Sequence, residues 1–77
     1  MLKDRQRKKI IGIYREMNYN VYDPATGANK ADMAKIEESL VKHWGKLLNE
    51  YSMQELSKII GVLENKFLPY FYKQLQK

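Results

Sequence analysis

The sequence predicts an all-α fold, a small three-helix bundle. Apolar residues recur at the three- and four-residue spacing of an amphipathic helix in three segments, and turn or capping patterns separate those segments. We expect helices at about residues 3–18, 30–50 and 53–67, and a short C-terminal helical turn after Pro69. The length of 77 residues indicates a single helical domain, 1–77, which without cysteine has no disulfide to stabilise it.

The first predicted helix combines an apolar stripe with a basic start. Ile10, Ile13, Tyr14 and Met17 fall on one helical face. The residues before them, 1–9, are rich in lysine and arginine and offer little apolar surface to a core. We therefore expect residues 1–9 to form a basic and mobile N-terminal arm.

A loop and two further helices follow. The stretch 23–27, Asp-Pro-Ala-Thr-Gly, has turn chemistry, so we expect residues 18–29 to form an irregular connection. Asn29 is the predicted N-cap of the second helix. Ser52 and Glu55 have the spacing of a capping box, which begins the third helix. The apolar residues of the second helix are spaced close to a heptad: Met33, Ile36, Leu40, Trp44, Leu47 and Tyr51.

Two interpretations of residues 53–72 remain open. In the first, one helix runs to about Phe67, and Pro69 ends or kinks it because proline lacks a backbone N–H. In the second, a turn at Gly61 divides the segment into a helix-turn-helix, and residues 64–72 form its recognition helix. The second interpretation would add a base-reading element to the protein.

The residue pattern argues against an enzyme. One histidine and no cysteine cannot make an ordinary zinc site, and the four glycines are isolated rather than gathered in a phosphate-binding loop. Ser39 and His43 lie one helical turn apart, but the sequence fixes no third group to orient them. We expect no catalytic residue, no metal and no cofactor.

Positive charge is concentrated near the N-terminus. The net charge is +5, and the first sixteen residues supply +4 of it. Such a segment attracts a polyanion, and guanidinium groups suit phosphate oxygens. The basic residues that we predict to hold phosphates are Lys3, Arg5, Arg7, Lys8, Lys9 and Arg15. The sequence therefore predicts a small regulatory or accessory protein that binds nucleic acid, in particular duplex DNA.

Two further residues are candidates for contacts to base edges. Asn65 and Lys66 would lie on the outer face of the recognition helix in the helix-turn-helix interpretation. Asparagine can read adenine and lysine can read guanine in the major groove.

An aromatic run near the C-terminus supports an alternative function. Residues 67–72, Phe-Leu-Pro-Tyr-Phe-Tyr, cannot all face one small core, so some of Leu68, Tyr70 and Tyr72 are predicted to be exposed. Tyrosine is enriched in interface cores. The alternative is a protein-interaction adaptor or inhibitor, by analogy with small proteins of mobile genetic elements. Its partner would be a larger protein or a second copy in a homodimer.

The sequence shows no segment that resembles a targeting signal. No apolar stretch reaches the length of a secretory signal or a membrane span, so we expect a cytoplasmic protein. Anchoring of the basic helix to a membrane surface is disfavoured, because the stripe from Ile10 to Met17 that would insert into lipid is the stripe that a core needs.

Overall fold

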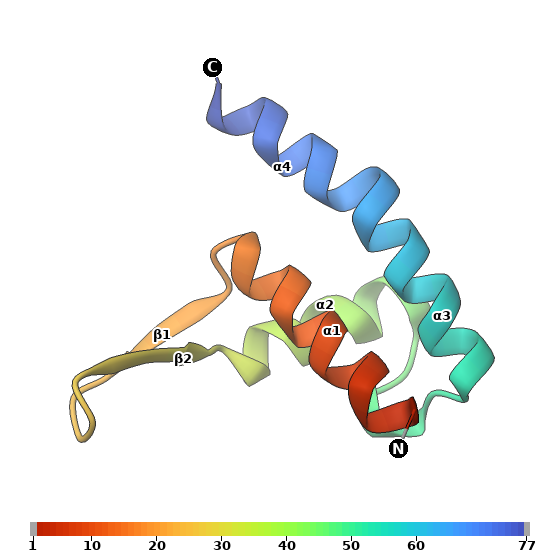
Figure 1. The fold of residues 1–77 in the computed structure, drawn as a ribbon, viewed down its shortest axis with the longest axis horizontal. Coiled ribbons are helices and arrows are strands. Elements are labelled where there is room, and N and C mark those ends of the chain that lie inside the picture. The colour runs from red at the N-terminus through yellow and green to blue at the C-terminus, as the bar shows by residue number, and fades with distance from the viewer. Residues whose placement is uncertain (1, 77) are drawn as a thin grey trace.

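The computed structural model describes residues 2–76, so Met1 of the predicted arm and Lys77 lie outside the described chain. The protein is mostly helical and small, with a short two-stranded sheet (Figure 1). The all-α prediction is therefore correct only in part. In chain order the elements are α1 (Leu2–Glu16), β1 (Asn20–Asp23), β2 (Ala28–Ala31), α2 (Met33–Trp44), η1 (Leu48–Glu50), α3 (Met53–Val62), η2 (Leu63–Phe67) and α4 (Leu68–Leu75).

The first helix agrees with the prediction in its apolar face. Ile10, Ile13, Tyr14 and Met17 are all buried. The basic segment before them is helical from Leu2 onward and belongs to α1.

The first difference from the prediction is a β-hairpin in place of the irregular connection over residues 18–29. Strands β1 and β2 pair antiparallel, from Asn20 opposite Ala31 to Asp23 opposite Ala28. The turn uses Gly27 at a φ of 69°, a conformation that glycine adopts without strain. Most of the hairpin residues are exposed, so no face shows the alternation of apolar and polar residues that would have revealed a strand.

Asp23 connects the two strands through its side chain. Its carboxylate accepts a hydrogen bond from the backbone N–H of Ala25 at 3.0 Å and pairs with Lys30 Nζ at 2.6 Å. The contact with Lys30 is the main reason that the pKa of Asp23 lies below its usual value.

The second helix is shorter than the predicted range 30–50. Asp32, rather than Asn29, caps it by accepting from the backbone N–H of Lys35 at 3.2 Å. It ends at Trp44, because Gly45 adopts a left-handed conformation with a φ of 87°. The heptad prediction therefore spans a real helix end, and Tyr51 lies outside α2.

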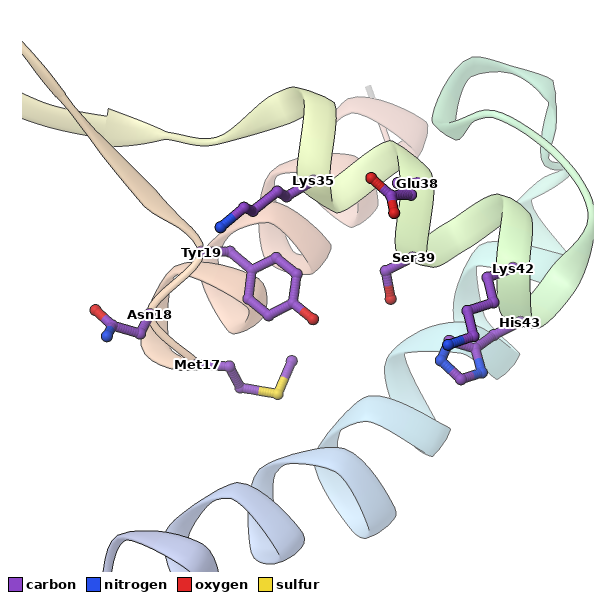
Figure 2. Close-up of a pocket in the computed structure, with 8 residues that line it drawn as sticks. All are labelled: Met17, Asn18, Tyr19, Lys35, Glu38, Ser39, Lys42 and His43. Carbon is purple, nitrogen blue, oxygen red and sulfur yellow. The ribbon is translucent and has the colours of Figure 1, made fainter.

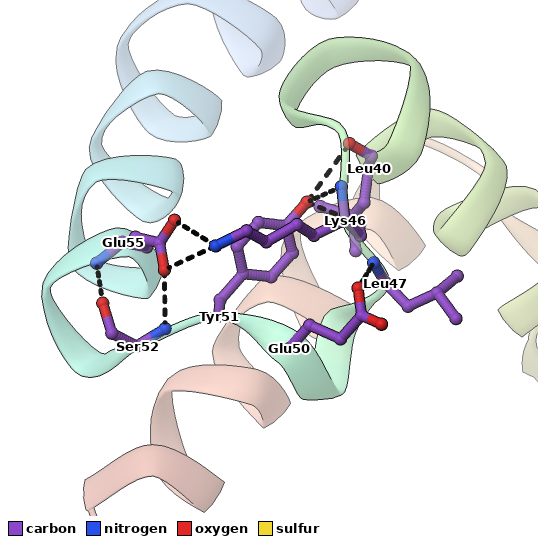
Figure 3. A network of polar contacts seen from close by, with 7 residues as sticks. All are labelled: Leu40, Lys46, Leu47, Glu50, Tyr51, Ser52 and Glu55. Carbon is purple, nitrogen blue, oxygen red and sulfur yellow. Dashed lines mark hydrogen bonds and ion pairs between the residues drawn. The ribbon is translucent and has the colours of Figure 1, made fainter.

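Tyr51 instead anchors the connection between α2 and α3. Its ring is 2% exposed, and its hydroxyl lies 2.6 Å from the carbonyl oxygen of Lys46 and 3.3 Å from that of Leu40. The backbone N–H of Lys46 donates to the same hydroxyl at 3.2 Å. Figure 3 shows how this ring lies beneath the turn.

The capping box at the start of α3 is confirmed. The backbone N–H of Glu55 donates to Ser52 Oγ at 3.2 Å, and the Glu55 carboxylate accepts from the backbone N–H of Ser52 at 2.9 Å. Lys46 Nζ pairs with the same carboxylate at 3.1 Å. These contacts, with the bond to Ser52 first, hold the pKa of Glu55 below its usual value.

The C-terminal segment is one continuous helical run from α3 through η2 to α4 (Figure 1). No turn interrupts it at Gly61, so residues 53–72 do not form a helix-turn-helix. Of the prediction that Pro69 ends or kinks the helix, the ending is wrong, because helical structure continues from η2 into α4. Element η2 is a wide π turn in which the backbone N–H of Leu68 reaches the carbonyl of Leu63, five residues earlier. Pro69 then lies in the first turn of α4, where its missing N–H costs little.

The core lies chiefly between α1 and α3, with α2 and Tyr51 closing its side. The Tyr14 hydroxyl shares a hydrogen bond with Ser39 Oγ at 2.9 Å inside this core. Burial raises the pKa of Tyr14 to about 12, so its hydroxyl is protonated at neutral pH. The buried hydrophobic residues are Ile10, Ile13, Tyr14, Met17, Ile36, Leu40, Leu48, Tyr51, Leu56, Ile59 and Leu63.

Replacing the Tyr51 hydroxyl should destabilise the fold. In Tyr51→Phe the ring remains but the backbone groups of Lys46 lose a buried partner, which should lower the free energy of unfolding by about 1–2 kcal/mol. Urea denaturation followed by circular dichroism measures the change. Tyr22→Phe on the exposed hairpin is the control. Equal stability of the two variants would contradict the anchoring role.

Acidification should weaken the cap of α3. Because the pKa of Glu55 is lowered in the folded state, the ionised carboxylate stabilises the fold above the usual pKa of 4.5. That contribution is lost as the pH falls through the folded-state value. Glu55→Gln should therefore make stability less dependent on pH below about pH 4.5. Thermal melts across this range test it against Glu38→Gln, a change at an exposed glutamate of α2.

Candidate nucleic-acid interface

The outward face of α1 carries a row of basic residues. Arg5, Lys8 and Arg15 recur at helical spacing, with Gly12 between them, and all are exposed. They lie opposite the apolar stripe, which is buried. Since one face of this helix is fixed in the core, the other is held toward solvent as an extended basic surface.

Hydrogen bonds to neutral groups hold Arg15 in place. Its guanidinium donates to Asn20 Oδ1 at 3.0 Å and to the carbonyl oxygen of Asn29 at 3.4 Å. The amide of Asn20 donates in return to the carbonyl oxygen of Arg15 at 3.1 Å. Both acceptors of the guanidinium are neutral, so the hairpin orients Arg15 and leaves its positive charge uncompensated. Sequence reasoning assigned Asn29 to a helix cap and missed Asn20, because a hairpin was not predicted.

Two other basic residues do have acidic partners. Arg7 pairs with Asp4 at 3.0 Å, and Lys9 lies 3.9 Å from Glu64 of η2. The second pair is long and exposed, so it contributes little to stability. Lys3, Arg5 and Lys8 form no ion pair with any residue in the range 2–76. The predicted cluster is therefore present, but it is partly neutralised.

The predicted base-edge residues, Asn65 and Lys66, lie on η2 rather than on the outward face of α1. Asn65 and Lys66 are exposed on the π turn, directly after Glu64, which pairs with Lys9. Lys66 lines a groove between α2 and α4. Lys66 thus lies at the groove, whereas Asn65 directly follows the residue that pairs with α1.

The predicted self-association residues lie on α4. Tyr70 is 66% exposed, and Leu68 is half-buried. Tyr72 is 46% exposed, and its hydroxyl donates to Glu16 Oε2 at 2.9 Å, which ties α4 to the end of α1. This hydrogen bond is the main reason that the pKa of Tyr72 is raised.

Ser39 and His43, the pair considered for catalysis, are engaged in other contacts. The Ser39 hydroxyl is engaged with Tyr14, while the His43 ring packs edge-on against Phe67 with their centroids 5.0 Å apart. Within residues 2–76, no group of three histidine, aspartate or glutamate side chains is placed to hold a metal ion. Among the same residues, every helix is too short or too polar to cross a lipid bilayer.

Comparisons with protein-family models, curated proteins and solved structures find no match to this chain. The function of the protein must therefore be inferred from its own geometry and charge.

Removing the Glu16 charge should lower the pKa of Tyr72. Phenolate formation is disfavoured beside a carboxylate, so Glu16→Gln should lower the pKa of Tyr72 toward 10.0. A pH titration of the tyrosine ring carbon followed by NMR measures this. Glu37→Gln on α2 should leave the Tyr72 curve unchanged. An unaltered curve in Glu16→Gln would contradict the contact between α1 and α4.

Proposed function

We propose that this protein binds nucleic acid, in particular duplex DNA, through the outward face of α1. The observation that carries the proposal is the row of cations on one exposed face, of which Arg5, Lys8 and Arg15 have no acidic partner among the described residues. Lys3 is a fourth such cation, in the first turn of the helix, but it lies on another side of the axis from Arg5. A surface of this kind matches the phosphate backbone in charge and in linear form.

Local helix stability does not account for these residues. Cations in the first turns of a helix oppose its macrodipole and cost a few tenths of a kcal/mol each at an exposed site. Lys3 and Arg5 lie in the first turn of α1, and no ion pair among the described residues offsets this cost for them. A polyanionic ligand gives the charges a role that folding does not.

The proposed binding is independent of base sequence. Contacts to phosphates position a protein on a duplex but carry no direct sequence information. Asn65 and Lys66, the candidates for base contacts, have no separate recognition helix, because the helix is continuous through Gly61, and they are not part of this proposal. We therefore propose an accessory or regulatory role based on backbone contacts.

A salt titration tests this proposal. With about three phosphate contacts, the logarithm of the association constant should fall by roughly 2.7 per tenfold increase in salt. The double variant Arg5→Gln/Lys8→Gln removes two of them and should reduce this slope by about 1.8. Fluorescence anisotropy with a labelled duplex measures both slopes.

The matched control removes the same charge elsewhere. Lys58→Gln/Lys73→Gln alters two exposed lysines of α3 and α4 and should keep the steeper slope. Two duplexes of unrelated sequence should bind equally. The proposal fails if the wild-type protein does not bind at low salt, or if both double variants reduce the salt slope equally.

A second candidate function is a protein-interaction adaptor or inhibitor. The observation that favours it is the exposed surface of α4, where Tyr70 and Leu75 are each 66% exposed. In Figure 1 this helix runs outward from the body of the molecule. Large apolar side chains gathered on a projecting helix are typical of a partner-binding site.

A further inference from the structure

A groove runs between α2 and α4. It consists of two adjoining hollows of about 440 and 490 Å³, which share Met17, Tyr19 and His43. Residues 17–19 and α2 line the first hollow, and the second extends to α4. Figure 2 shows Met17 and Tyr19 between α2 on one side and the C-terminal helical run on the other. The groove is thus built from three parts of the chain that are distant in sequence.

One wall of the groove is an apolar helical face. Phe67, Tyr70, Phe71 and Gln74 line it, and their spacing is that of one face of an α-helix. Tyr70 remains largely exposed, so nothing within the described chain covers this face fully. The wall offers aromatic surface over about two helical turns.

The rims of the groove are positively charged. Lys35 and Lys42 come from α2 at a seven-residue spacing, and Lys66 comes from η2 on the opposite side. None of these lysines forms an ion pair with a residue in the described part of the chain. Glu38 is the one acidic residue that lines either hollow.

We propose that this groove binds an amphipathic helix with an acidic polar face, supplied by a different protein. A third helix can lie between two helices and bury apolar residues at positions i, i+3, i+4 and i+7. Glutamate or aspartate residues beside those positions would pair with Lys35, Lys42 and Lys66. This proposal names the partner for the protein-interaction candidate and is independent of nucleic-acid binding by α1.

Charge argues against a second copy as the occupant. The sequence of α4, Leu-Pro-Tyr-Phe-Tyr-Lys-Gln-Leu, contains a lysine and no acidic residue. Its insertion would bring a positive charge toward rims that are already cationic. The groove and α4 of this chain are therefore not complementary.

Ring packing argues against unpaired bases as the occupant. The Phe67 ring stacks on Trp44, with their centroids 5.7 Å apart and an angle of 24° between the planes. His43 meets the same ring edge-on. Bases need free aromatic faces on which to stack, and Phe67 has already used one of its faces.

Selection from a peptide library tests the partner chemistry. The probe is a yeast-displayed library of random peptides about 16 residues long, enough for roughly four helical turns. Wild-type protein should enrich peptides with apolar residues at helical spacing and an excess of glutamate and aspartate. Anisotropy with a synthetic copy of an enriched peptide then gives its affinity.

Variants locate the binding site. Tyr70→Ala and, separately, Lys42→Glu/Lys66→Glu should each lower the affinity for the enriched peptide at least tenfold. Tyr22→Ala and Lys58→Glu/Lys73→Glu change exposed residues outside the groove and should leave its affinity within twofold. Circular dichroism confirms that each variant is folded. Arg5→Gln/Lys8→Gln should not affect the peptide, and Tyr70→Ala should not affect duplex DNA, so the two proposals can fail separately.

Several outcomes would overturn the inference. These are enrichment of basic or unpatterned peptides, enrichment of peptides that resemble residues 67–75, and absence of any peptide that is sensitive to the groove variants. A single-stranded oligonucleotide that displaces the peptide and is itself weakened by Lys42→Glu/Lys66→Glu would assign the groove to nucleic acid instead.

Discussion

Burial of the apolar face of α1 against α3 is the contact on which the rest of the structure depends. Ile10, Ile13 and Tyr14 fix the rotation of α1 about its own axis, and burying each such side chain contributes roughly 1.5–3 kcal/mol. Once that rotation is fixed, Arg5 and Lys8 must point to solvent, because they occupy the opposite face. The same rotation places Met17 at the bottom of the groove between α2 and α4. Packing in the core therefore determines where the surface charge is displayed.

The parts of the fold that could be predicted from the sequence are those with local causes. The stripe of α1 and the capping box of Ser52 and Glu55 depend on spacings of three or four residues, and both are present. The hairpin could not be predicted in this way, because most of its residues are exposed and show no alternation. Tyr51 fits the heptad by spacing, yet it is a loop anchor, since Gly45 ends α2 before it.

The candidate site was predictable in composition and unpredictable in detail. The basic residues of α1 are plain in the sequence, but which of them have an acidic neighbour depends on the tertiary structure. Glu64 approaches Lys9 from η2, whereas Arg15 meets only neutral oxygens of the hairpin. The groove was missed because Met17, His43 and Phe67 come from different elements, and no local pattern joins them.

The π turn at Leu63–Phe67 has a consequence for how one helix serves two neighbours. A π turn holds one residue more than the α-helical repeat, so every later side chain is displaced around the axis by roughly a quarter of a revolution. Upstream of it, Leu56 and Ile59 face the core beside α1, and downstream Tyr70 and Phe71 face α2 across the groove. The π turn thus separates a seam that packs the core from the helical face that lines the groove.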